Sequence, residues 1–108
     1  MRVISRRTLT SYLASRERYA DYKALKSATE TWYRVVKAAE WPNMAAVKKS
    51  FGSADPITGD RVVFDIKGND YRLVAAIDFE KQLLWIKFFG THKEYDSIDA
   101  RKVRYVRR

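Results

Sequence analysis

The residues most able to do chemistry in this chain lie close together near its C-terminal end. The only histidine of the sequence, His92, is followed three residues later by Tyr95. An imidazole can take up or give up a proton near neutral pH, because histidine has an unperturbed pKa of about 6.5. If residues 91–96 form a turn of helix, the two side chains share a face. The spacing therefore indicates general acid–base chemistry as one hypothesis.

A purely structural role explains the same residues. In the run Thr91-His92-Lys93-Glu94-Tyr95-Asp96, Thr91 could cap a short helix, and Glu94 stands three residues later as in a capping box. His92 would then merely pack against its surroundings, which is the more common fate of a lone histidine. The residues by themselves leave both interpretations open.

Composition excludes several kinds of site. The chain has no cysteine, so disulfides, cysteine-ligated zinc and thiol nucleophiles are absent, and with one histidine a metal ion would depend on carboxylates alone. Neither a G-x-S-x-G elbow nor a phosphate-binding glycine loop is present, so hydrolases and nucleotidases of those kinds have no support. No apolar run approaches the roughly 18 residues that a membrane span needs. We therefore expect a cytoplasmic protein without metal, cofactor or membrane partner.

The net charge of +9 is distributed unevenly along the 108 residues. Residues 1–59 carry 11 basic and 5 acidic side chains, residues 60–100 carry 6 and 8, and residues 101–108 carry 5 and 0. A polyanion would therefore be attracted by the N-terminal half and by the tail. Nucleic acid is the favoured partner, and a solvated basic surface with an acidic protein partner is the alternative.

Hydrophobic spacing predicts a brief strand at residues 2–5 and three helices after it. Thr8, Asp21 and Asn43 stand where helix N-caps are expected. The helix after Asp21 is predicted to run for about five turns and to end before Trp41-Pro42. Its apolar face consists of Leu25, Ala28, Trp32, Val35 and Ala39.

The second half of the chain is predicted to form antiparallel strands. Residues 61–67, 70–78 and 83–89 are rich in β-branched and aromatic side chains, and residues 103–106 could add a short edge strand. The turn Gly68-Asn69 suits a type II′ hairpin, because glycine accepts the positive φ at the first central position. Helices followed by such a sheet predict an α+β fold.

The register of the first hairpin decides which side chains share a face of the sheet. With Lys67 opposite Asp70, the apolar face comprises Val62, Phe64, Ile66, Tyr71, Leu73, Ala75 and Ile77. If the third strand turns Leu84, Ile86 and Phe88 inward, the second face comprises Asp65, Lys67, Asp70, Arg72, Val74, Trp85, Lys87 and Phe89. We expect this second face to be cationic, aromatic and open to solvent.

Cations beside flat rings are typical of proteins that bind single-stranded RNA. Lys67, Arg72 and Lys87 could contact phosphates, and a ring such as Trp85 could stack on a base, at ~1–3 kcal/mol per base. The alternative is that the acidic and basic residues of the hairpin form cross-strand ion pairs worth only ~0.2–1 kcal/mol each. Trp85 could equally be covered by a terminal segment or a helix.

The string VFDIKGNDYRLVAAIDFEKQLLWIKFFGTHKEYDSIDA resembles the C-terminal half of the HigB family of toxins from bacterial toxin–antitoxin modules. The G-N, Y-R-L and T-H-K-E-Y-D elements occur in the family's order and spacing, and the similarity covers about residues 60–100. The preceding helices resemble the family more loosely. The resemblance implies one RelE-like domain over residues 1–108, with N-terminal helices packed on one face of a small, mainly antiparallel sheet.

The resemblance also implies an activity, namely a metal-independent mRNA interferase that acts on the translating ribosome and is neutralised by a helix-turn-helix antitoxin, HigA. In the implied reaction the ribose 2′-oxygen, stripped of its proton by a base, attacks the adjacent phosphorus, and an acid protonates the departing 5′-oxygen. The need for a 2′-hydroxyl would make RNA the substrate. A non-catalytic RNA-binding or repressor-complex subunit with the same fold is the alternative.

Roles carried over from the resemblance divide the candidate residues into two groups. Arg72 and Lys87 are expected on the scissile phosphate, His92 as general base or acid, and Tyr95 as proton donor or orienting group. The expected RNA-binding residues are Lys67, Asn69, Trp85 and Lys93. The presence of all four catalytic candidates favours the enzyme, while Asn69 has an alternative role in the turn.

Overall fold

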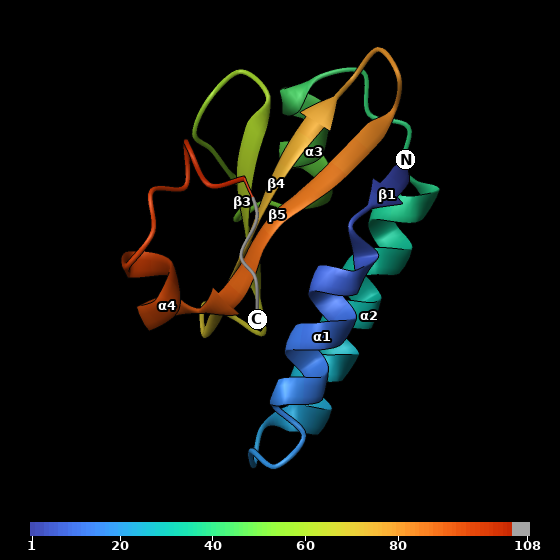
Figure 1. Cartoon of the computed structure of the whole chain (residues 1–108). Helices are drawn as coiled ribbons and strands as arrows, with labels where there is room; N and C mark the ends of the chain where they lie inside the picture. The colour runs from blue at the N-terminus through green and yellow to red at the C-terminus, as the bar shows by residue number, and fades with distance from the viewer. Residues whose placement is uncertain (105–108) are drawn as a thin grey trace.

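The computed structural model describes residues 1–104, which have an α+β architecture. Within them, five strands form one sheet in the order β1-β5-β4-β3-β2. The elements in chain order are β1 (Arg2–Ile4), α1 (Arg6–Ser15), α2 (Tyr22–Ala38), α3 (Met44–Ser50), β2 (Asp55–Pro56), β3 (Arg61–Ile66), β4 (Tyr71–Asp78), β5 (Leu83–Thr91) and α4 (His92–Asp96). α1 and α2 lie side by side on one side of the sheet, and α4 lies on the other side (Figure 1). The predicted fold class is confirmed.

The sheet is mainly antiparallel. Strands β3, β4 and β5 follow one another as antiparallel neighbours, and β2 pairs antiparallel with β3. Only β1 runs parallel to its partner, β5. The first strand of the chain therefore completes the sheet beside the last described strand.

The predicted register of the β3–β4 hairpin is confirmed. Asp65 lies opposite Arg72, and the last ladder pair is Ile66 with Tyr71. Gly68 has a φ of 65°, the positive value that a type II′ turn needs at its first central position. Lys67 also has a positive φ, of 56°, so the strand ends one residue earlier than predicted.

The predicted helix starts are only partly confirmed. Asn43 caps α3, because its side chain accepts a hydrogen bond from the backbone N–H of Ala46 at 3.0 Å. Asp21 stands at the N-cap of α2, although its side chain makes no capping bond. The cap expected at Thr8 is wrong, since α1 begins earlier with Ser5 at its N-cap and Thr8 is buried inside the helix.

No helix of residues 1–104 is both long and apolar enough to cross a bilayer.

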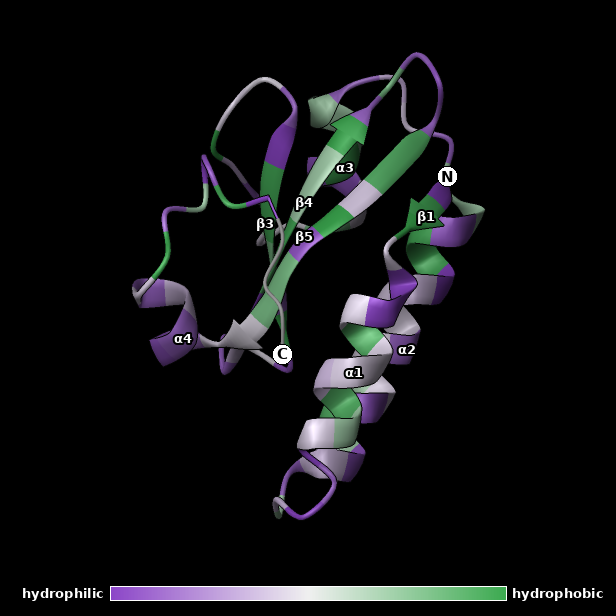
Figure 2. Ribbon diagram, viewed as in Figure 1, coloured by the Kyte–Doolittle hydropathy of each residue, from purple (hydrophilic) through white to green (hydrophobic). Residues whose placement is uncertain are grey.

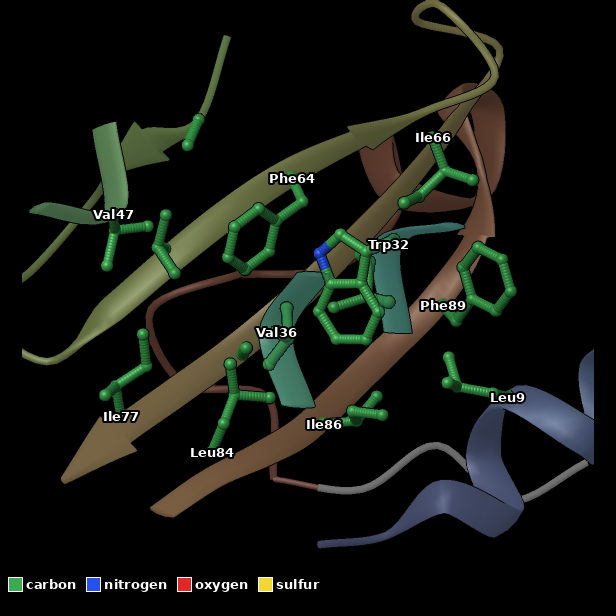
Figure 3. Packing of buried hydrophobic residues seen from close by; sticks show 14 of the residues in the cluster. Leu9, Trp32, Val36, Val47, Phe64, Ile66, Ile77, Leu84, Ile86 and Phe89 are labelled. Atoms are coloured by element: carbon green, nitrogen blue, oxygen red, sulfur yellow. The ribbon is translucent and has the colours of Figure 1, made fainter. Parts of the chain in front are cut away.

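The main core lies between the helices and the sheet (Figure 3). The ring centre of Phe64 on β3 lies 5.4 Å from that of Trp32 on α2 and 5.1 Å from that of Phe51, and both contacts are edge-on. Hydrophilic residues gather on the outer surfaces of the helices (Figure 2). The prediction of Val35 in this core is wrong: Val36 is buried and Val35 is exposed. At 100° per residue, Val35 lies about 90° around the helix from the mean direction of the buried residues of α2.

A β-bulge changes the faces of β5. The pairing of β4 with β5 shifts between Val74 and Ala75, and Lys87 is the extra residue on the opposite strand. Beyond this point the alternation of β5 is reversed relative to the prediction. Phe88 lies on the second face and Phe89 lies in the main core, so the predicted orientations of both are wrong.

Candidate active site

The second face, which points away from α1 and α2, is less open than predicted. Val63, Val74 and Phe88 form a small buried cluster on it. The residues that cover this cluster are Ile57, Tyr95, Ile98, Ala100 and Val103. The guanidinium of Arg61 holds the covering segment by donating hydrogen bonds to the carbonyl oxygens of Ala100, at 3.0 Å, and Val103. The predicted strand at residues 103–106 is not seen at Val103 and Arg104, and its other residues lie outside the described part of the chain.

Arg72 lies on the same face, and its side chain is 20% exposed. Its Nε is 2.9 Å from Oδ1 of Asp65 on the neighbouring strand, an ion pair without the straight geometry of a hydrogen bond. The cross-strand pair considered in the sequence analysis is therefore present. The guanidinium also lies 5.4 Å from the ring centre of Tyr95. Because the contact with Asp65 is made through Nε, it does not occupy the two terminal nitrogens, which make no hydrogen bond to residues 1–104.

Tyr95 is placed by α4, whose start follows the predicted capping box. Thr91 accepts a hydrogen bond from the backbone N–H of Glu94 at 3.0 Å, and Glu94 Oε1 accepts one from the backbone N–H of Thr91 at 2.8 Å. The backbone N–H of His92 donates to the carbonyl of Asp70 at 3.0 Å and so ties α4 to the β3–β4 turn. The ring of Tyr95 leans over the second face toward Arg72.

His92 does not pack against the protein, in contrast to the structural alternative. Its side chain is 47% exposed, and its Nδ1 lies 3.2 Å from Oδ2 of Asp96 one turn later on α4. A carboxylate at one ring nitrogen sets the imidazole orientation and leaves the other nitrogen to exchange protons. Asp96 is therefore a further candidate site residue, and its spacing of four residues from His92 was the signal in the sequence that could have indicated it.

Lys87 is partly exposed at the bulge of β5. Bulges are found next to active sites because they redirect a side chain. Among residues 1–104, no carboxylate lies within ion-pair distance of its ammonium group. Lys87 is thus a cation without an internal counter-charge on the strand that also carries Phe88.

Lys67 is not on the second face, which corrects the prediction. Its ammonium group contacts Oδ2 of Asp70 at 2.8 Å and lies 3.9 Å from Oδ2 of Asp21, at the start of α2. The left-handed backbone of Lys67 takes it out of the strand alternation and turns it toward the helices. The hydrogen bond with Asp70 raises the pKa of Lys67, so the side chain stays charged.

The remaining RNA-binding candidates are spread out. Asn69 is exposed in the β3–β4 turn, and Lys93 is exposed on α4. Trp85 is half-buried opposite Ala76, four residues along β4 from Arg72, which corresponds to about 13 Å. The structure thus brings Arg72 and Tyr95 into contact, and it does not bring Trp85 or Lys67 to them. Residues 1–104 contain no group of three or more acidic or histidine side chains that could hold a metal ion.

This chain is similar in sequence to a family of known proteins. Residues 25–98 match the family described as HigB toxin, RelE-like toxic component of a toxin-antitoxin system. The chain is 28% identical over 82 residues to the mRNA interferase HigB of Escherichia coli O6:H1, a match that covers 74% of this chain and 76% of that protein. It is 47% identical over 38 residues to the HigB mRNA interferases of Escherichia coli K12 and Shigella flexneri, covering 35% of this chain and 36% of each relative.

Proposed function

Because this chain belongs to the HigB toxin family, the RelE-like toxic components of toxin–antitoxin systems, we propose that it is an endoribonuclease that cleaves messenger RNA. The observation that carries the proposal is the placement of Arg72. Its terminal nitrogens point to no internal partner among residues 1–104, while Tyr95 lies against the same guanidinium. A planar fork of donors beside a phenol suits a phosphate that gains negative charge during cleavage.

The proposed reaction uses Arg72 together with the other catalytic candidates. His92, oriented by Asp96 at 3.2 Å, removes the proton of a ribose 2′-hydroxyl through its other ring nitrogen. The 2′-oxygen attacks the adjacent phosphorus, and Arg72 and Lys87 stabilise the charge on the non-bridging oxygens. The bond from phosphorus to the 5′-oxygen then breaks, leaving a 2′,3′-cyclic phosphate.

Tyr95 supplies the proton for the departing 5′-oxygen in this scheme. The guanidinium of Arg72, 5.4 Å from the ring centre, keeps Tyr95 beside the phosphate that Arg72 binds. The proton held by His92 returns to Tyr95 through solvent, so the enzyme is regenerated without a metal or cofactor. The hydroxyl that RNA has and DNA lacks is a reactant, which makes RNA the substrate class.

The wider setting is proposed from family and charge. The partner is an antitoxin of the helix-turn-helix HigA type, and cleavage takes place on the translating ribosome in the cytoplasm. The net charge of +9 supports binding to ribosomal RNA, and residues 1–108 act as one domain. Asn69 and Lys93, both exposed near His92, are the RNA contacts that this geometry supports best.

Cleavage by the purified chain tests the proposal. End-labelled mRNA is incubated with and without translating ribosomes, and the 3′ ends are analysed for cyclic phosphate. We expect cleavage that needs the ribosome, falls at least 100-fold in Arg72→Ala and disappears when the attacked nucleotide is a 2′-deoxynucleotide. Lys49→Ala, an exposed basic residue on α3, is the matched control and keeps full activity.

Two outcomes would contradict the proposed activity or the proposed site. Folded wild-type protein that binds RNA or antitoxin and leaves the RNA intact would establish the non-catalytic subunit instead. Cleavage of equal rate in the Arg72→Ala and Lys49→Ala variants would show that the site lies elsewhere.

A further inference from the structure

A buried tyrosine of α1 is bonded to the helix that carries His92 and Tyr95. Tyr12 is 2% exposed, and its hydroxyl donates a hydrogen bond of 2.7 Å to Oε1 of Glu94, 82 residues away in the chain. The same carboxylate oxygen accepts the backbone N–H of Thr91 at 2.8 Å. One oxygen thus joins the helix layer to the first turn of α4.

The carboxylate of Glu94 is closely packed on both sides. It lies against the backbone of Gly90, where a Cβ would come within 3.1 Å of Oε1 of Glu94. On the other side, the ring of Tyr12 packs against Phe89 at 5.0 Å and Tyr71 at 6.2 Å. The hydroxyl is therefore held in direction as well as in distance.

α4 depends on such contacts for its position. It has five residues, none of them buried, and a helix of this length is not stable in isolation. The capping box shapes its first turn but does not attach it to the helices that cover the other face of the sheet. Burial and then the hydrogen bond to Glu94 raise the pKa of Tyr12, so this donor stays protonated throughout the neutral range.

We propose that Tyr12 is a positioning residue, which acts through Glu94 to hold α4 where Tyr95 lies over Arg72 and His92 faces the RNA. The expected effect on catalysis rests on the proposed function, whereas the expected effect on the position of α4 does not. The family match begins at residue 25, so α1 and Tyr12 lie outside it. The bridge therefore adds a contribution of the N-terminal helix to a site built by β4, β5 and α4.

The variant Tyr12→Phe removes the hydroxyl and keeps the aromatic packing. Hydrogen bonds to charged groups are stronger than those between neutral groups, so we expect the exchange protection of backbone amides 92–97 to fall about tenfold or more. On RNA, kcat falls about tenfold while KM changes less than twofold, because the phosphate-binding cations are untouched. Tyr33→Phe, a hydroxyl deletion on α2 away from α4, is the matched control and changes neither quantity.

The route through Glu94 is tested by combining substitutions. In Glu94→Ala, a further Tyr12→Phe change has no added effect on exchange or kcat, because the bond is already lost. In Glu94→Gln, the amide oxygen still accepts from Tyr12 and from Thr91, so protection stays within about threefold of wild type. If Tyr12→Phe instead disrupted the whole fold, it would lower the urea midpoint, and its loss of exchange protection would add to that of Glu94→Ala.

The exchange measurement decides the proposal without any substrate. Unchanged protection of residues 92–97 in Tyr12→Phe overturns it, and so does an effect of equal size with and without Glu94. If the wild-type protein cleaves no RNA, the proposed function fails, and the loss of protection in Tyr12→Phe still establishes the bridge.

Discussion

Gly90 on β5 lies close to the ring of Phe88 and to the side chain of Glu94 on α4. We predict that Gly90→Ala lowers the free energy of unfolding by about 2 kcal/mol. Gly90 is buried, and an added Cβ would lie 2.7 Å from Cζ of Phe88 and 3.1 Å from Oε1 of Glu94. A distance of 2.7 Å is too short for two carbon atoms that are not bonded to each other, so either the ring of Phe88 or the backbone of Gly90 has to move.

Neither neighbour can move freely, and this gives the magnitude. The ring of Phe88 is 2% exposed in the cluster of the second face, and overpacking such a ring costs ~1–3 kcal/mol. The carboxylate of Glu94 holds the hydroxyl of Tyr12 and the backbone of Thr91, and weakening one of these bonds costs a similar amount. For a domain of about 100 residues, 2 kcal/mol corresponds to a fall of roughly 10 °C in Tm.

Urea unfolding followed by circular dichroism measures this change, and Gly59→Ala is the matched control. A Cβ at Gly59 meets nothing within 4 Å, and its φ is not in the left-handed region. That variant should stay within about 0.5 kcal/mol of wild type. Equal stability of the two variants would refute the argument from the close approach at Gly90. A loss of stability at Gly90 with unchanged exchange in α4 would confine the strain to Phe88.

Three further predictions concern the covering segment, pH and salt. Arg61→Ala releases its two carbonyl partners, so limited proteolysis within residues 98–103 should accelerate about tenfold, and an unchanged rate would contradict this. Burial and then the hydrogen bond to Asp21 raise the pKa of Tyr71 in the folded protein. The neutral Tyr71 side chain therefore contributes its full stability below the pKa of the unfolded chain, about 10, and this contribution is lost as the pH rises through the pKa of the folded protein. Urea midpoints should therefore fall above pH 10 in wild type and fall less in Tyr71→Phe, and parallel curves would show that Tyr71 contributes nothing. Lys87→Ala should reduce the salt slope of RNA binding by about 0.7, whereas Lys49→Ala leaves it unchanged in fluorescence anisotropy titrations.

Much of the local structure could be predicted from neighbouring residues. The β3–β4 register, the positive φ of Gly68 and the capping box of Thr91 and Glu94 follow from short-range preferences, and the structure confirms all three. The contact between Asp65 and Arg72 follows from the same register. Each of these features is decided within one hairpin or one helical turn.

The errors in the sheet arose where a single residue changed the alternation of a strand. The bulge at Lys87 exchanged the faces of Phe88 and Phe89, because one extra residue reverses every side chain beyond it. The left-handed backbone of Lys67 moved its ammonium group toward Asp21. Alternation carries no marker for such an insertion, so neither change was readable from the pattern.

By itself, the sequence determined the family, the fold class and the catalytic candidates, because these depend on local motifs, periodicity and charge. Only the tertiary structure decided which candidates meet: Arg72 lies against Tyr95, and Trp85 lies about 13 Å along the strand. It also decided that residues 98–103 cover part of the second face and that Tyr12 reaches Glu94. Contacts between residues so far apart in the chain arise from packing the whole core, which no short stretch of sequence encodes.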